Sequence, residues 1–396
     1  MSEKKEFMFF IDAMGGGGAE RVISVLVPEF VKDGIEVSIV MMRKKEIAYH
    51  LPKQVHLYYA SDLKVSIYGK IVRKLFKYHN NLRGKYVPLL QKKGLLKKLP
   101  EWNETTFYFY SKFALPFKGL LKQHKNCIAF GFLIRSSAVL AMASRGLPIK
   151  TVYCERSNPK RHNIQNSLIR LRDRYYPKYK SGIFQTEDVM RYYTRLKGPK
   201  RIILNPITEG LPEPHKGKRK REVITFCRLG KEKNLTMLID AFEKTRKDYP
   251  NFVLKIYGEG SEKEYLINYI RKNNLNDCVF IKDFAPNIHE LVKESYMFVS
   301  TSNYEGLSNS MLEAMAIGLP CICTDCDGGG ARMMIEDHIN GLLIPKGDTE
   351  ALYRSMIELM ESEELCNNLS LNAAKVRNEL TPSKIAREWE SFAFSL

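Results

Sequence analysis

Apolar segments of strand length alternate with helical segments along most of this chain, and this alternation limits the folds that it can adopt. The first unit has an apolar run at residues 6–14 and a run of glycines, followed by Val22, Leu26 and Phe30 at helical spacing. Strands that alternate with helices predict a parallel, doubly wound sheet. We therefore expect an α/β protein with Rossmann-like domains.

The alternation stops once, at residues 205–221. This segment contains several prolines and a basic cluster and has no periodicity. Because 396 residues are also too many for one ordinary core, the sequence predicts two domains. We place them at residues 1–205 and 222–380, joined by a linker at 206–221, and we expect a helix at 381–396 to return to the first domain.

The positive charge is concentrated in the first half of the chain. Residues 1–200 hold 38 Lys and Arg against 15 Asp and Glu, or +23, and the other residues hold 25 against 29, or −4, which together give the total of +19. An anionic membrane surface, a pyrophosphate-bearing acceptor and nucleic acid are all compatible with this charge. Any acidic partner is therefore expected at the first domain.

A basic segment at residues 64–98 carries eleven Lys or Arg and no acidic residue, interleaved with leucines and aromatic residues. One interpretation is a solvated helical face that caps the first domain. The other is a contact with an anionic membrane interface. Both remain open from the sequence.

Composition disfavours several other classes of protein. No apolar run approaches the ~20 residues of a membrane-spanning helix, and the first residues contain no obvious secretion signal. Several of the eight cysteines lie in apolar, strand-like runs, which fits a reduced, cytoplasmic protein. Cys321, Cys323 and Cys326 have no second Cys or His pair at ligand spacing, so we expect neither a metal site nor a cofactor.

Two acidic residues flank a polar loop in the second half of the chain. Glu305 precedes Gly306 and the Ser308-Asn309-Ser310 run, and Glu313 lies in the helix that follows. A strand, a small polar loop and a helix present free backbone N–H groups to an anion such as a diphosphate. The alternative is that Ser310 and Glu313 form a capping box and that Glu305 is a surface carboxylate.

Two cations lie upstream of that loop. Arg228 ends a strand, and Lys233 follows it just before a helix. At the carboxyl end of a parallel strand, both side chains could reach one oxyanion and stabilise a leaving diphosphate without a metal. Either residue could instead be an ordinary solvated cation.

The glycines at 15–18 let the backbone approach a phosphate or a sugar closely. A dinucleotide fingerprint would need a third glycine near position 20 and an acidic residue after the second strand, where this chain has Glu20 and Arg43. The sequence therefore disfavours NAD binding.

Several segments in this order resemble glycosyltransferase family 4. They are Gly-Gly-Ala-Glu-Arg-Val from position 17, Glu-Arg-Ser-Asn-Pro from 155, Phe-Gln-Thr-Glu from 184, Asn-Pro-Ile from 205, Arg-Leu-Gly-Lys-Glu-Lys-Asn from 228, Tyr-Gly-Glu-Gly from 257 and Glu-x7-Glu from 305. The resemblance covers nearly the whole chain. It is strongest to the branch that extends polyprenyl-diphosphate-linked glycans and capsules.

The resemblance implies a GT-B fold and a retaining transfer of a hexose or N-acetylhexosamine from a nucleotide-diphosphate sugar. UDP is the expected nucleotide, and the expected acceptor is a lipid-linked glycan at the inner face of the cell membrane. The implied donor-site residues are Arg228 and Lys233 at the diphosphate, Glu313 at the ribose, Glu305 at the sugar, the N–H groups of Leu307, Ser308 and Asn309 at the phosphates, Gly258, Gly260 and Phe284 near the base, and Gly16 and Gly17 facing the donor from the other domain.

The chain departs from the family at one position. Many members have a His where this chain has Glu155, so the role of that His cannot be carried over. We expect Glu155 to bond a sugar hydroxyl or the acceptor. The alternative is that Glu155 pairs with Arg156 or a neighbouring cation and shapes its loop.

Two other functions remain open. The charge of the first half would suit a basic nucleic-acid-binding protein, although recognisable nucleic-acid motifs are absent. A second possibility is a different nucleotide-sugar enzyme on the same fold, such as an epimerase or a phosphorylase.

Replacing Lys92, Lys93, Lys97 and Lys98 by Gln should weaken binding to anionic vesicles, because each cation near such a surface contributes ~1 kcal/mol. Vesicle co-sedimentation over a series of salt concentrations measures this, since screening reduces the attraction as salt rises. Transfer to a lipid-linked acceptor should slow while donor hydrolysis stays unchanged. If the variant binds vesicles as tightly as the wild type at every salt concentration, the result would favour the interpretation of the basic segment as a solvated helical face.

Overall fold

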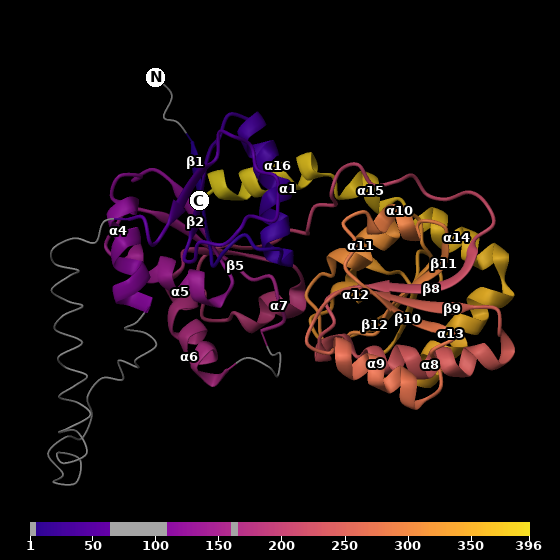
Figure 1. Cartoon of the computed structure of the whole chain (residues 1–396). Helices are drawn as coiled ribbons and strands as arrows, with labels where there is room; N and C mark the ends of the chain where they lie inside the picture. The colour runs from indigo at the N-terminus through magenta and orange to yellow at the C-terminus, as the bar shows by residue number, and fades with distance from the viewer. Residues whose placement is uncertain (1–4, 64–108, 160–164) are drawn as a thin grey trace, which may run out of the picture.

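The computed structural model describes residues 5–63, 109–159 and 165–396, and the basic segment at 64–98 lies outside these ranges. The described residues form two lobes, each built on a parallel β-sheet flanked by helices (Figure 1). This confirms the prediction of two doubly wound α/β units. Within the same ranges, no helix is both long enough and apolar enough to cross a bilayer.

The first lobe holds a seven-stranded sheet in the order β3-β2-β1-β4-β5-β6-β7, and every neighbouring pair is parallel. The order changes direction between β1 and β4, and the carboxyl ends of parallel strands form a crevice at such a point. The strands are β1 (Glu6–Ile11), β2 (Glu36–Met41), β3 (His56–Tyr59), β4 (Ile128–Phe132), β5 (Lys150–Cys154), β6 (Ser181–Phe184) and β7 (Lys200–Ile202). The helices are α1 (Gly18–Lys32), η1 (Tyr110–Ala114), α4 (Leu115–Leu121), α5 (Ile134–Ala143), α6 (Asn166–Tyr175), η2 (Tyr176–Lys178) and α7 (Glu187–Tyr192).

The second lobe holds a six-stranded parallel sheet in the order β10-β9-β8-β11-β12-β13, with its change of direction between β8 and β11. The strands are β8 (Lys220–Phe226), β9 (Val253–Tyr257), β10 (Val279–Lys282), β11 (Ser295–Ser300), β12 (Cys321–Asp325) and β13 (Leu342–Pro345). The helices are η3 (Lys231–Lys233), α8 (Leu235–Asp248), α9 (Lys263–Lys272), α10 (Ile288–Val292), α11 (Asn309–Ala316), α12 (Gly330–Met334), α13 (Thr349–Glu361), α14 (Glu363–Ala373) and α15 (Val376–Glu379). The last helix of the chain, α16 (Pro382–Phe394), follows them.

Helix α1 shows how the sequence pattern produces packing. Val22, Leu26 and Phe30 are all buried in the core, which confirms their predicted helical spacing. Phe30 stacks on Phe9 of β1 with ring centroids 5.9 Å apart. Gly34 follows the helix with a φ of 78°, a conformation that glycine adopts without strain.

Helix α16 leaves the second lobe and packs on the first lobe beside α1 (Figure 1). Trp389 is fully buried there and stacks on Phe132 of β4 with ring centroids 5.8 Å apart. Phe394 contacts Phe7 of β1, with centroids 5.5 Å apart. The chain therefore crosses between the lobes twice, and the first lobe is built from segments on both sides of the second.

One acidic residue lies within this helix packing. The Glu390 carboxyl lies against Asp33 at the end of α1, and its Oε1 is buried without a hydrogen-bond partner among the described residues. Burial, and then the Asp33 carboxylate, raise the pKa of Glu390 to about 7, although Lys5 and Arg387 act in the opposite direction. The folded chain therefore holds this proton more tightly than the unfolded chain does.

We expect Glu390→Gln to raise the free energy of unfolding near pH 8 and to change it little near pH 5. A carboxyl with a raised pKa penalises the folded state as the pH rises from its ordinary value of 4.5 to about 7, and the full penalty is present above that. Because the carboxyl is partly exposed, the gain should be on the order of 1 kcal/mol. Guanidinium denaturation followed by Trp389 fluorescence in a Trp102→Phe background measures it. Glu388→Gln on the same helix is the control, and an equal gain at both pH values would contradict the prediction.

Candidate functional site

A half-buried ion pair lies where the strands of the second sheet end. Lys233 lies in the turn after β8, and Glu305 lies in the loop between β11 and α11. Lys233 Nζ pairs with Glu305 Oε2, and the two side chains are 13% and 28% exposed. The structure thus brings together a predicted cation and a predicted acid that stand 72 positions apart.

This pairing determines the charge of Lys233. Burial acts to lower the pKa of its ammonium, but the Glu305 carboxylate beside it outweighs burial and raises that pKa above its usual value. The site therefore holds a cation that is already removed from water. An anionic ligand that replaced the carboxylate would meet this cation at little further desolvation cost.

Arg228 points away from this pair. Its side chain is 73% exposed, and its Nη2 pairs with Glu232 Oε1. The two predicted cations therefore do not share one oxyanion in this structure. An exposed pair of this kind contributes only about 0–1 kcal/mol, so Arg228 could exchange Glu232 for a ligand at small cost.

The second acidic residue bridges the lobes. Glu313 is buried, and its Oε1 lies 2.7 Å from Arg21 Nη2 of α1, while its Oε2 lies 2.9 Å from His289 Nε2 of α10. Arg21 also donates to the Thr208 hydroxyl of the linker at 2.9 Å. A carboxylate has about four acceptor positions, so Glu313 keeps capacity for the hydroxyl groups of a ligand.

The capping-box alternative for this helix is wrong. Ser308, not Ser310, caps α11, and its hydroxyl accepts the Met311 N–H at 3.4 Å. Glu313 does not return to the start of the helix, because both of its oxygens are engaged by α1 and α10.

The loop before α11 is held by the first lobe. The Leu307 N–H donates to Gln185 Oε1 at 3.3 Å, and Asn205 Nδ2 donates to Asn309 Oδ1 at 2.7 Å. Gln185 in turn donates to Asn205 Oδ1 at 2.9 Å. The Leu307 N–H, one of the three groups expected at a phosphate, thus has a partner within the protein.

The glycine loop of the first lobe lies opposite the start of α11, since a Cβ on Gly18 would lie 3.6 Å from Asn309 Nδ2. The N–H groups of Gly16 and Gly17 both donate to Glu20 Oε2, at 2.7 and 2.9 Å. These N–H groups, expected to face the donor, are therefore already held by a carboxylate of their own helix. A ligand at this loop would meet its exposed backbone beside Glu20.

The other predicted donor residues follow β9 and β10. A Cβ on Gly258 would lie 1.9 Å from the carbonyl oxygen of Cys227, and one on Gly260 would lie 2.2 Å from that of Leu229. Both positions need glycine because two loops pack backbone against backbone there. Phe284 lies in the loop after β10 and is 70% exposed, so its ring is accessible to a planar ligand.

Glu155 follows β5 and is buried, with only 1% of its surface exposed. Its Oε2 accepts the hydroxyls of Tyr153, at 3.0 Å, and Tyr193. Its Oε1 accepts the N–H of Arg156 at 3.1 Å and both the N–H and the hydroxyl of Ser157, at 3.1 and 2.8 Å. Five donors from the protein thus surround one carboxylate, a geometry that favours the loop-shaping alternative.

Glu155→Gln should therefore destabilise the fold by about 2–3 kcal/mol, because an amide has one acceptor oxygen and would set its NH₂ group against other donors. Tyr193→Phe, which removes a single donor, should cost only about 1 kcal/mol. Chemical denaturation measures both. If Glu155→Gln were as stable as the wild type but had lost turnover, the result would favour the other interpretation, in which Glu155 bonds a sugar hydroxyl or the acceptor.

Three residues that contact the site were not predicted from the sequence: Arg21, Gln185 and His289. Arg21 and Gln185 stand in the Gly-Gly-Ala-Glu-Arg-Val and Phe-Gln-Thr-Glu segments, so their place in these motifs was a usable signal. His289 lies on a short helix outside any motif, and only the folded geometry places it at Glu313.

Comparison with known proteins identifies what these segments are similar to. Residues 208–376 match the family model described as glycosyl transferases group 1. The chain is 26% identical over 395 residues to the N-acetylgalactosamine-N,N'-diacetylbacillosaminyl-diphospho-undecaprenol 4-alpha-N-acetylgalactosaminyltransferase of Campylobacter jejuni, with 96% of each chain covered. It is 30% identical over 177 residues to the poly(glycerol-phosphate) alpha-glucosyltransferase of Bacillus subtilis. That match covers 45% of this chain and 26% of the relative, so the chain spans about a quarter of that protein.

Solved structures share the fold at low identity. TarM of S. aureus has a TM-score of 0.72 and 17% identity, covering 98% of this chain and 99% of TarM. HepE of Anabaena, solved with UDP and glucose, has a TM-score of 0.73 and 16% identity, covering 99% of this chain and all of HepE. These likenesses confirm the predicted GT-B arrangement of two Rossmann-like domains. The family match and the full-length relative of C. jejuni do not favour the nucleic-acid-binding alternative.

Proposed function

We propose that this chain, whose residues 208–376 match the glycosyl transferases group 1 model, is a glycosyltransferase. In this proposal it transfers a hexose or N-acetylhexosamine with retention, from a UDP-linked donor to a lipid-linked glycan. The half-buried Lys233–Glu305 pair carries this proposal. It places one desolvated cation and one acid side by side where the strands of a parallel sheet end, which is where such sheets bind ligands. The relative of C. jejuni, whose name specifies a diphospho-undecaprenol acceptor, supports the acceptor class.

The two residues of this pair have complementary tasks in the proposed reaction. When the donor binds, its diphosphate replaces Glu305 beside Lys233, and Glu305 is released to accept a hydrogen bond from a hydroxyl of the donor sugar. As the bond from the anomeric carbon to the phosphate oxygen breaks, Lys233 and the start of α11 offset the negative charge that grows on the diphosphate. Arg228 joins them by exchanging Glu232 for a phosphate oxygen.

Retention follows from attack on the same face. The acceptor hydroxyl bonds to the oxocarbenium-like anomeric carbon on the side that the diphosphate leaves, and its proton passes to the leaving phosphate. The protein then supplies positioning and a preorganised field, and it needs no metal for the charge on the leaving group. Glu313 binds the ribose hydroxyls while Arg21 and His289 hold its carboxylate in place.

The lipid-linked acceptor implies that the enzyme works at the inner face of the cell membrane. The excess of cations in the first half of the chain supports a peripheral contact with anionic lipid. We include the basic segment at 64–98 in this proposal on its composition.

A panel of UDP-sugars and GDP-sugars tests the donor class, because a ligand at 100 times its dissociation constant adds about 2.7 kcal/mol of stability. NMR of the product's anomeric proton then tests retention, and the assay is repeated in EDTA to test metal independence. No stabilisation by any nucleotide sugar, an inverted product, or complete loss of transfer in EDTA that Mg²⁺ restores would each contradict the corresponding part of the proposal.

Lys233→Ala should lower turnover by ~10²–10³-fold, because it removes the desolvated cation from the charge that grows on the leaving group. Steady-state rates at saturating donor measure this loss. Lys231→Ala is a matched control, since Lys231 is exposed in the same short turn. Wild-type turnover in a folded Lys233→Ala protein would refute the assigned role.

A further inference from the structure

Three neighbouring side chains of the first lobe contact the second lobe. Gln185 accepts the Leu307 N–H at 3.3 Å, and the Thr186 hydroxyl donates to the carbonyl oxygen of Gly328 at 2.6 Å. Asp188 Oδ2 lies 3.3 Å from Arg332 Nη1. All three follow β6 and lie at the start of α7, at the border of the two lobes (Figure 1).

The loops that they contact are packed directly on Glu305. The Glu305 N–H donates to the carbonyl oxygen of Asp327 at 2.9 Å. A Cβ on Gly328 would lie 1.8 Å from the carbonyl oxygen of Glu305, and one on Gly330 would lie 1.9 Å from that of Gly306. Because the two backbones are in direct contact and share this hydrogen bond, a shift of the 326–330 loop would disturb the position of Glu305.

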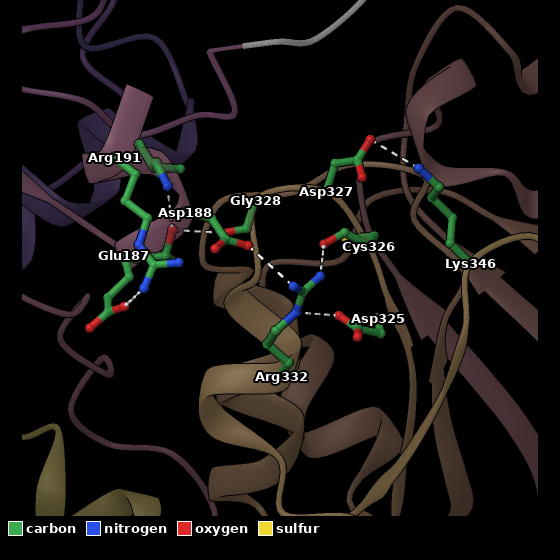
Figure 2. Close-up of polar contacts among 11 residues, drawn as sticks. Glu187, Asp188, Arg191, Asp325, Cys326, Asp327, Gly328, Arg332 and Lys346 are labelled. Carbon is green, nitrogen blue, oxygen red and sulfur yellow. Dashed lines mark hydrogen bonds and ion pairs between the residues drawn. The ribbon is translucent and has the colours of Figure 1, made fainter. Parts of the chain in front are cut away.

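The contacts across the border are specific. Gln185 and Thr186 are each only 2% exposed, and buried polar groups require partners. Their partners are a backbone N–H and a backbone carbonyl of the second lobe, so their hydrogen bonds fix both the separation and the orientation of the loops. Arg332 extends the contact inward, since it also donates to Asp325 Oδ1 at 2.5 Å and to the carbonyl oxygen of Cys326 at 3.4 Å (Figure 2).

We propose that Gln185, Thr186 and Asp188 form a clamp through which the first lobe positions Glu305 for transfer. The clamp residues touch no reacting atom and act as positioning residues. Thr186 holds the 326–330 loop, which contacts the Glu305 backbone, and Gln185 holds the next turn at Leu307. Asp188 acts on the same loop through Arg332 of α12, which donates to the Cys326 carbonyl. Glu305 therefore has the position needed for transfer only when the two lobes are in contact. The inference rests on the proposed function, because it assigns a purpose to the placement of Glu305.

The chain provides its own control for this clamp. Glu187 stands between Thr186 and Asp188 but pairs with Arg191 of the same helix, at 2.6 Å. Figure 2 shows Asp188 directed at Arg332, while the Glu187–Arg191 pair remains within α7. A change at Glu187 alters the charge and polarity of α7 without removing a contact between the lobes.

Turnover tests the clamp with graded variants. Thr186→Val should lower kcat by about tenfold while the affinity for UDP stays within about twofold, because the clamp acts on Glu305 and not on the nucleotide. Thr186→Ser keeps the hydroxyl and should restore kcat, and Glu187→Gln should match the wild type. Equal losses in Thr186→Ser and Thr186→Val, or a loss of UDP affinity as large as the loss of kcat, would overturn the inference.

The Asp188–Arg332 ion pair gives a second test, which needs no substitution at a buried residue. Asp188→Asn and Arg332→Gln should each lower kcat, and the double variant should lose no more than the worse single variant. Both side chains are 39–45% exposed, so neither change leaves a buried group unpaired. Fully additive losses would show that the pair does not act as a unit.

Hydrogen exchange separates the clamp from the proposed activity. Amide exchange in a peptide covering residues 303–311 should be faster in Gln185→Ala and Thr186→Val than in the wild type, and unchanged in Glu187→Gln. Unchanged exchange in all variants would overturn the clamp. If the wild type transfers no sugar while the exchange differs as expected, the proposed function fails and the mechanical link to Glu305 stands.

Discussion

Every strand pair in both sheets is parallel, so each loop that follows a strand emerges at the same edge of its sheet. The turn after β1, the loop after β5 and the start of α7 therefore lie together in the first lobe, and the loops after β8, β11 and β12 lie together in the second. The contacts between Arg21 and Glu313, and between Thr186 and Gly328, show that these two edges face each other. Strand direction alone thus brings together residues that lie far apart in the sequence.

The charges at this meeting point are already paired. Lys233 holds Glu305, Arg21 and His289 hold Glu313, and the glycine N–H groups hold Glu20. Unpaired charges removed from water would cost far more than these pairs do. An anionic ligand can therefore enter by taking the place of a carboxylate beside its cation, so that the cation keeps a partner during the exchange. This favours a ligand that carries several negative oxygens. Each carboxylate that the ligand displaces leaves a cation or an N–H group without an acceptor, and a ligand oxygen can take that place.

The architecture was predictable because it depends on local periodicity. Val22, Leu26 and Phe30 repeat at helical spacing within one element, so their burial could be read from the sequence. The proximity of Lys233 and Glu305 could also be predicted from the sequence, since both residues follow strands of one parallel sheet. The partners of Glu155 were not predictable, because Tyr193 approaches it from the end of helix α7, and no spacing rule relates the two positions. The cap of α11 was misassigned for a different reason: Ser308 and Ser310 are both good caps, and the choice depends on where the preceding loop packs.

The return of α16 to the first lobe affects how the chain folds as it is made. Domains generally fold in the order in which they leave the ribosome, so most of the first lobe can collapse early. Trp389, however, covers the rings of Phe9, Phe130 and Phe132, and it is synthesised only after the whole second lobe. The nascent first lobe therefore exposes an aromatic surface for as long as the second lobe is being translated. A ribosome that stalls in the second lobe leaves this surface open to chaperones and proteases, whereas a chain that completes both lobes closes it with its own helix.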